Sequence, residues 1–210
     1  GLMEKLLVPL LAKLANFIPD GGIWMNTQRP EWNDANNALV GYGVSVVTLG
    51  YVHRYVRFLQ RLLGSLDSNE THELSLEVSA WLANQAESLG RATSVQEPWS
   101  PMARRNLLDQ LGEGATTYRT TLYEKGLSGN RTATTTGALS NFLEDAMALV
   151  SESLRSNIRE DGLYHAYNTL ALNPAGGVEL QRLDPMLEGQ VSILSSGLLR
   201  PDEALSVLDA

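Results

Sequence analysis

The sequence predicts an all-α fold in which successive helices pack as antiparallel hairpins. Apolar residues recur at steps of three and four along most of the chain, which is the spacing of one helix face. No stretch keeps the alternation of apolar and polar residues that a half-buried strand shows. The connections between the periodic segments are short, so consecutive helices are expected to lie side by side. We therefore expect a single all-α domain spanning residues 1–210.

The first half of the chain contains three predicted helices. Pro9 suits a first helical position, and the helix that it begins is expected to end at Asp20–Gly22. The strongest apolar periodicity runs from about Val44 to Leu63. A third helix is expected from about Thr71 to Leu89, with Gly90 as its stop.

The second half contains four further predicted helices. Ser100 suits the capping position of a helix that starts at Pro101 and runs to about Lys125. Thr136 is expected to cap the next helix, and the segment 160–178 is expected to be irregular. The remaining predicted helices lie at 137–159, 186–196 and 201–208.

The composition argues against several classes of protein. Of 210 residues, 43% are hydrophobic, which is enough for a sizeable core. The formal net charge is −8 and no basic stripe is visible, so no nucleic-acid partner is expected. No apolar run reaches the ~20 residues of a membrane helix, so no membrane partner is expected. The chain has no cysteine and its three histidines lack ligand spacing, so neither a metal nor another cofactor is expected.

Searches for targeting and nucleotide motifs are negative. The N-terminal apolar run is short, lies between Lys5 and Lys13, and is followed by no small-residue cleavage site. In the absence of a targeting signal, a cytoplasmic location is the expectation. No Gly-rich phosphate loop and no Gly-x-Ser-x-Gly elbow occur.

The most distinctive stretch of the chain is Thr27–Gly43, which combines polar and aromatic residues without a regular period. Such a stretch beside regular segments favours a functional site. Trp32 offers an aromatic face to a sugar ring. A carboxyl group that donates a proton near neutral pH needs an apolar neighbour, and Trp32 is one for Asp34 or Glu31. Alternatively, Asp34 caps a turn and Trp32 is a core ring.

Two further stretches carry candidate residues. Arg159–Asn168 offers a carboxylate pair, an imidazole and two phenols, and a second carboxylate across a cleft is what inverting sugar chemistry requires. The alternative is a helix end with a satisfied histidine. In Asp184–Gln190, Glu188 or Gln190 is a candidate for lining a site. The alternative is a helix-start carboxylate aligned with the helix dipole.

The run Trp32-Asn33-Asp34-Ala35-Asn36-Asn37 resembles the Trp-Asn-Asp-Gly stretch of cellobiose and chitobiose phosphorylases. These enzymes belong to the six-hairpin (α/α)6 glycosidase group, and the resemblance implies that Asp34 is the general acid. The run from Arg159 to Ala166 is similar to a later Arg-Glu-Asn-Gly stretch followed by Tyr and His-Ala. This similarity implies that Glu160 lies near the sugar and that Tyr164 or His165 lies near the second substrate.

The resemblance also sets the expected architecture. The predicted hairpins would form part of an (α/α)6 toroid, which needs on the order of 300 residues for twelve helices. The chain is therefore expected to belong to a larger carbohydrate-active polypeptide. Glu31 and Ala35 depart from the family pattern, which has aspartate and glycine there. No Gly-rich phosphate-binding segment is found, so hydrolysis is as consistent with the sequence as phosphorolysis.

We therefore predict a glycoside hydrolase or phosphorylase-like catalytic-domain fragment that acts on a carbohydrate substrate by general acid catalysis. Asp34 would donate the proton, and Glu160 or Glu188 would act as the base or as a sugar ligand. The expected substrate-binding residues are Arg29, Glu31, Trp32, Asn36, Asn37, Tyr164, His165 and Glu188. The alternatives are a non-enzymatic helical interaction or scaffold domain and a domain that binds sugar without cleaving it.

Overall fold

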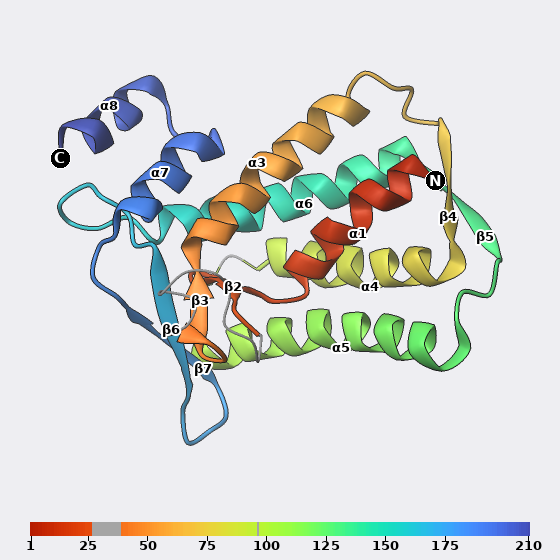
Figure 1. The fold of residues 1–210 in the computed structure, drawn as a ribbon, viewed down its shortest axis with the longest axis horizontal. Helices are drawn as coiled ribbons and strands as arrows, with labels where there is room; N and C mark the ends of the chain where they lie inside the picture. The colour runs from red at the N-terminus through yellow and green to blue at the C-terminus, as the bar shows by residue number, and fades with distance from the viewer. Residues whose placement is uncertain (27–38, 96) are drawn as a thin grey trace.

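A computed structural model describes residues 1–26, 39–95 and 97–210 of the chain, and Figure 1 shows how their helices and strands are arranged. The helices are α1 (Leu2–Leu14), α3 (Val46–Leu63), α4 (Leu76–Thr93), α5 (Pro101–Lys125), α6 (Thr136–Arg155), α7 (Leu187–Ser196) and α8 (Pro201–Asp209). The strands are β1 (Phe17–Ile18), β2 (Gly22–Trp24), β3 (Gly43–Ser45), β4 (Thr71–Ser75), β5 (Arg131–Thr135), β6 (Tyr167–Leu172) and β7 (Val178–Arg182).

The fold is mixed, so the predicted all-α fold, with its place in an (α/α)6 toroid, is wrong. The described residues are 58% helix and 16% strand. Within them, five strands form a curled antiparallel sheet in the order β1-β2-β3-β6-β7, and β4 pairs with β5 in a separate antiparallel sheet. The molecule therefore carries a β-layer that an arrangement of helical hairpins lacks.

The hairpin formed by β6 and β7 falls largely in the segment 160–178, which the sequence led us to expect as irregular. Its turn is closed by Asn173, whose Oδ1 accepts hydrogen bonds from the backbone N–H groups of Ala175 at 3.1 Å and Gly177 at 2.8 Å. The turn residues are visible in the sequence. The strands are not, because Tyr167–Leu172 has no apolar alternation and the alternation in Val178–Arg182 covers only five residues.

The small sheet replaces part of a predicted helix. Thr71–Ser75 pairs with Arg131–Thr135, so the helix expected from Thr71 begins instead at Leu76. Most of the side chains in these two strands are exposed or half-exposed, and their burial gives no apolar stripe. Threonine is the residue that favours the strand here, since Arg131–Thr135 contains three of them.

The positions of the long helices are close to the prediction. The helix predicted from Pro101 to Lys125 is confirmed, and Ser100 caps it by accepting a hydrogen bond from the Ala103 N–H at 3.2 Å. The cap of α6 is Thr135, one residue before the expected Thr136.

Pro9 lies inside α1, so the prediction that it begins a helix is wrong. Proline in a helix interior removes one backbone hydrogen bond. The buried leucines of α1 lie on both sides of Pro9, and their packing against the core offsets this loss. These are Leu7, Leu10, Leu11 and Leu14.

Helix α5 lies opposite the sheet, and this arrangement positions the candidate site. Figure 1 shows β4 and β5 at one end of the helices and the five-stranded sheet toward the other, with α5 running along the edge between them. Leu108 of α5 packs with Ile18, Val44 and Val178 of the sheet in one buried cluster. The N-terminal half of α5 is thereby fixed against β1 and β7.

Candidate functional site

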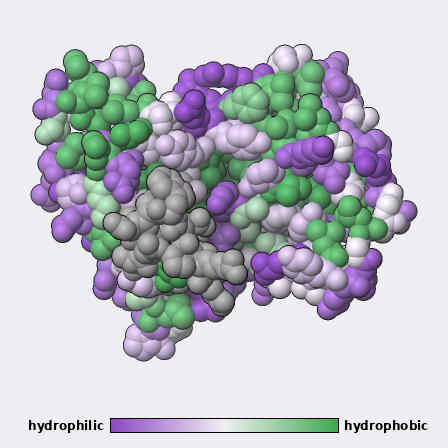
Figure 2. Space-filling model, viewed as in Figure 1, coloured by the Kyte–Doolittle hydropathy of each residue, from purple (hydrophilic) through white to green (hydrophobic). Residues whose placement is uncertain are grey.

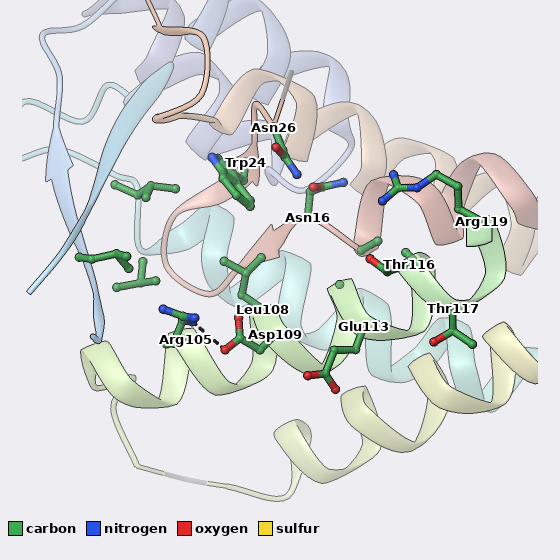
Figure 3. Close-up of a pocket in the computed structure, with 16 residues that line it drawn as sticks. Asn16, Trp24, Asn26, Arg105, Leu108, Asp109, Glu113, Thr116, Thr117 and Arg119 are labelled. Atoms are coloured by element: carbon green, nitrogen blue, oxygen red, sulfur yellow. Dashed lines mark hydrogen bonds and ion pairs between the residues drawn. The ribbon is translucent and has the colours of Figure 1, made fainter. Parts of the chain in front are cut away.

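A cleft of about 790 Å³ opens between α5 and the five-stranded sheet (Figure 3). One wall is α5, the opposite wall is the end of α1 with β2, and side chains of β6 and β7 close one end. Its volume lies within the ~300–1,000 Å³ that is usual for small-molecule sites. The lining residues are Ala15, Asn16, Trp24, Asn26, Arg105, Leu108, Asp109, Gly112, Glu113, Ala115, Thr116, Thr117, Arg119, Leu170, Leu172 and Val178.

Trp24, the last residue of β2, presents an indole ring to this cleft. Its backbone N–H donates to the Asn16 carbonyl at 2.8 Å, and its indole Nε1 donates to the Gly41 carbonyl at 3.0 Å. The side chain is half-buried, and Figure 3 shows it above Leu108 of α5. These two bonds fix the ring's orientation while part of its surface stays accessible.

The wall formed by α5 carries charged and small residues on one helix face. Arg105, Asp109, Gly112, Thr116 and Arg119 follow steps of three and four, so they lie along the same side. The Arg105 Nε lies 2.7 Å from the Asp109 Oδ2, and Figure 3 marks this ion pair. Gly112 lines the cleft without a side chain, which leaves space between the helix and the opposite wall.

Amide and hydroxyl groups gather toward the C-terminal part of α5. Figure 3 shows Asn16 and Asn26 on the wall opposite Thr116 and Arg119. The Asn16 Nδ2 donates to the Ala12 carbonyl at 3.1 Å, which holds that side chain in place. Amides both donate and accept hydrogen bonds, as sugar hydroxyls do. An exposed aromatic face beside such groups is the chemistry that binds carbohydrate.

The predicted residues of the first sequence stretch lie outside the described residues. They include the expected proton donor and most of the expected sugar ligands. These residues are Arg29, Glu31, Trp32, Asp34, Asn36 and Asn37.

Glu160, the other predicted catalytic residue, does not line the cleft. It is exposed in the turn after α6, and it makes no hydrogen bond or ion pair with any residue in the described part of the chain. Its neighbours Arg159 and Asp161 form an ion pair at 2.9 Å. The hydrogen bonds from the Arg159 side chain hold the pKa of Asp161 below its ordinary value. The ion pair between Arg159 and Asp161 therefore accounts for these charged residues of the turn without a ligand.

Tyr164 and His165 lie just before β6, Glu188 lies in the first turn of α7, and none of the three lines the cleft. The Tyr164 backbone exchanges two hydrogen bonds with the Gln190 side chain, at 2.9 and 2.7 Å. The His165 Nδ1 lies 2.8 Å from the Leu183 carbonyl oxygen. Burial lowers the pKa of His165 and raises that of Tyr164. The second and third stretches thus meet in space, but as packing between α7 and the sheet.

A second hollow, of about 440 Å³, lies beside the turn between β1 and β2. Trp99 lines it together with three carboxylates, from Asp20, Glu97 and Glu152. Asp20 is paired with Arg104 at 2.7 Å. Among the described residues, no three His, Asp or Glu side chains are grouped as metal ligands. None of the helices in the described ranges has the length and apolar character needed to cross a membrane.

The sequence prediction missed the residues that line the α5 cleft. Trp24 lies in a strand of three residues, too short to give a periodic signal. Asp109 and Arg119 have the spacing that charged residues show on any solvent-exposed helix face. The available signal was the small residue Gly112 within a charged face, since a small residue there leaves room for a ligand.

Comparison of the sequence with known protein families and with curated proteins gives no match.

Proposed function

We propose that this protein binds an oligosaccharide in the cleft between α5 and the five-stranded sheet, as part of a carbohydrate-active protein that cleaves a glycosidic bond. The observation that carries the proposal is Trp24, whose indole faces the cleft in a fixed orientation. A sugar ring presents C–H groups to such an aromatic face. Asn16 and Asn26 lie at the same cleft and supply donors and acceptors for the hydroxyls.

The cleaving activity rests on the resemblance of the stretch Trp32–Asn37 to cellobiose and chitobiose phosphorylases. That resemblance makes Asp34 the proton donor to the leaving oxygen. Asn26, the last described residue before this stretch, lines the cleft. The proposal therefore requires Asp34 to act on a sugar bound at Trp24. Glu160 and Glu188 have no part in it, since neither lines the cleft.

Binding is tested by isothermal titration with a panel of neutral oligosaccharides of different sugars and linkages. We expect at least one to bind, and Trp24→Ala to weaken its binding by about tenfold or more because the stacking surface is lost. Trp99→Ala is the matched control, since Trp99 is also half-buried but lines the other hollow. Equal effects of the two substitutions would contradict a site at Trp24. Absence of binding to the whole panel would favour the interaction or scaffold alternative.

Cleavage is tested with the sugars that bind, in the presence and absence of phosphate. We expect Asp34→Asn to lower kcat by at least a hundredfold while leaving sugar binding unchanged, because a general acid contributes about 10²–10⁴-fold. Products formed without phosphate identify hydrolysis. Binding with no turnover by the unsubstituted protein would restrict the function to sugar binding.

A further inference from the structure

The two arginines that line the α5 cleft differ in their partners. Arg105 is neutralised by Asp109, at 2.7 Å, and also donates to the Gly176 carbonyl at 3.3 Å. The Arg119 side chain forms no ion pair and no hydrogen bond with any residue that the structure describes. One positive charge at the cleft is therefore not compensated by the described part of the chain.

The helix itself provides no partner for Arg119. Side chains three and four residues apart on a helix are neighbours, and ion pairs usually form at these spacings. Around Arg119 these positions hold Ala115, Thr116, Leu122 and Tyr123, none of which is acidic. The same spacing does pair Arg105 with Asp109 on this helix. The sequence of α5 thus leaves the Arg119 guanidinium available to a ligand.

The orientation of Arg119 directs that charge into the cleft. Figure 3 shows its side chain reaching back along α5 toward Asn16 and Asn26. Side chains on a helix point toward its N-terminus, which agrees with this direction. The uncompensated carboxylate of Glu113 points away from Asn16 and Asn26 in the same view. The end of the cleft at Arg119 therefore favours a negative group.

The other end of the cleft favours a neutral ring. Trp24 lies there above Leu108, and Leu170 and Val178 pack with them in one apolar cluster. Leu108 and Arg119 are separated along α5 by about 16 Å at 1.5 Å per residue. The Arg119 side chain reaches back toward Trp24 and shortens this separation, but the distance that remains is longer than one sugar ring. A ligand that uses both ends has at least two rings.

We propose that the cleft selects an acidic oligosaccharide, with a neutral ring over Trp24 and the carboxylate of a neighbouring uronic acid ring paired with Arg119. The guanidinium fork matches a carboxylate through two parallel hydrogen bonds. A carboxylate carries one charge, which one arginine balances, whereas phosphate sites generally add backbone N–H groups or further cations. Acidic oligosaccharides are thus the substrate class that we infer for the α5 cleft, and this inference rests on the proposed function.

The test uses pairs of disaccharides that differ only in one C6 group, a hydroxymethyl in the neutral form and a carboxylate in the uronic acid. Isothermal titration is expected to show the uronic acid form binding at least about tenfold more tightly. Arg119→Gln is expected to abolish this preference, because glutamine has no charge to pair with the carboxylate. Arg119→Lys is expected to retain only part of it, because lysine keeps the charge and loses the fork. Arg61→Gln, on exposed α3 surface outside the cleft lining, is the matched control and is expected to change neither affinity.

The outcomes separate this inference from the function on which it rests. If both forms bind equally and Trp24→Ala weakens both, the preference for acidic sugars is wrong and sugar binding stands. If the uronic acid form binds more tightly but Arg119→Gln keeps that preference, Arg119 is not the residue that reads the carboxylate. If neither form of any pair binds, the proposed function fails together with the inference.

Discussion

Asp20, in the turn between β1 and β2, connects the sheet to the helices through its backbone. Its φ of 60° is in the left-handed region, which costs about 1–3 kcal/mol for a residue other than glycine. Its carbonyl accepts hydrogen bonds from the Asn157 Nδ2 at 3.0 Å and the Arg182 Nη1 at 2.8 Å. Its carboxylate pairs with Arg104 at 2.7 Å. These contacts from α5, β7 and the end of α6 hold the turn in its strained conformation.

Asn157 is the buried centre of this polar network, and its loss is predicted to destabilise the protein. Its side chain is 0% exposed. Its Oδ1 accepts from Asn168 at 2.9 Å and also from Arg182, and its Nδ2 donates to the carbonyls of Asp20 and Ser153. Asn157→Ala removes all four of these hydrogen bonds from a fully buried position, although each partner keeps another, so we expect the free energy of unfolding to fall by about 2–3 kcal/mol. Denaturation in urea measures the change.

Asn106→Ala provides the control for the Asn157 substitution. Asn106 is exposed in the second turn of α5, and alanine has the higher helix propensity. We expect this substitution to change the free energy of unfolding by no more than about 0.5 kcal/mol. If Asn157→Ala were as mild as Asn106→Ala, the buried network would not be holding the turn.

His53 on α3 gives the protein a pH-dependent stability. The residue is 4% exposed, and its Nδ1 lies 3.0 Å from the Ser196 carbonyl oxygen, which can only accept a hydrogen bond. Burial lowers the pKa of His53 below its ordinary value of 6.5, and the charges of Arg57 and Arg155 lower it further, against an opposing effect of the Ser196 carbonyl. The folded protein therefore resists protonation of this imidazole.

We predict that the free energy of unfolding decreases as the pH falls from about 7.5 to about 5.5. Above pH 6.5 His53 is neutral in both states, but below it the unfolded chain binds a proton that the folded chain resists, so acid favours unfolding. His53→Asn keeps a donor for the Ser196 carbonyl and has no proton to gain, so its loss over the same range is expected to be smaller. The pKa of His165 is also lowered, so the His53→Asn variant is still expected to lose some stability over this pH range. Urea denaturation at both pH values measures the free energy of unfolding of the two proteins. Equal losses in both would refute the role of His53.

At the scale of elements, local sequence located most of the helices, although it misplaced the start of α1, and it did not reveal the strands. The helix predicted from Val44 begins at Val46, because Gly43–Ser45 forms β3. Val44 pairs there with Trp24 on one side and Asn168 on the other, which are about 20 and about 120 positions away along the chain. Strand preference depends on such neighbours more than on the segment itself. A helix bonds within its own segment, so its periodicity is visible locally.

The α5 cleft was not predictable from the sequence. The aromatic and polar residues that the sequence prediction named for sugar, in 27–38, lie outside the described residues, and Trp24 and Asn26, which line the cleft, were not among those it named. Asp109 and Arg119 line the cleft only because the sheet lies across from α5. The phenol of Tyr164 made this residue a candidate, but Tyr164 is buried and its backbone N–H donates to Gln190 of α7. Partners distant in sequence therefore decided which residues form the cleft.

Gly22 in β2 is predicted to be indispensable for the sheet. Its φ is +141°, and a Cβ there would lie 2.7 Å from the Ser45 carbonyl oxygen of β3. Since backbone cannot move aside without breaking the pairing, we expect Gly22→Ala to cost about 3 kcal/mol or more, or to prevent folding. Gly129→Ala is the matched control: its φ is +79° in open space, so only the left-handed penalty of about 1–2 kcal/mol applies. Thermal unfolding and soluble yield measure both, and similar costs would contradict the close approach of β2 to β3.

On the scale of the whole molecule, apolar burial is unevenly distributed. The main core combines buried residues from α1, α3, α4 and α6, whereas the sheet has two smaller clusters of its own. In α8, all of which is described, Val207 alone is buried, while Leu205 and Leu208 are 58% and 68% exposed. Figure 2 shows apolar side chains gathered on the surface over α7 and α8. The C-terminal helix is therefore held by much less burial than the central helices.

This distribution predicts a hierarchy of amide hydrogen exchange. Protection follows the free energy of the opening that exposes each amide, so α3 and α6, in the main core, are expected to exchange slowest. The amides of α8 are expected to exchange by local opening, and Val207→Ala should accelerate them without changing α6. Mass spectrometry of peptides after timed exchange in deuterated buffer separates these segments. Ala204→Gly is the control for helix fraying. It lowers the helix propensity of α8 but removes no buried side chain. Protection of α8 as strong as that of α6 would mean that the C-terminal helix unfolds only with the core.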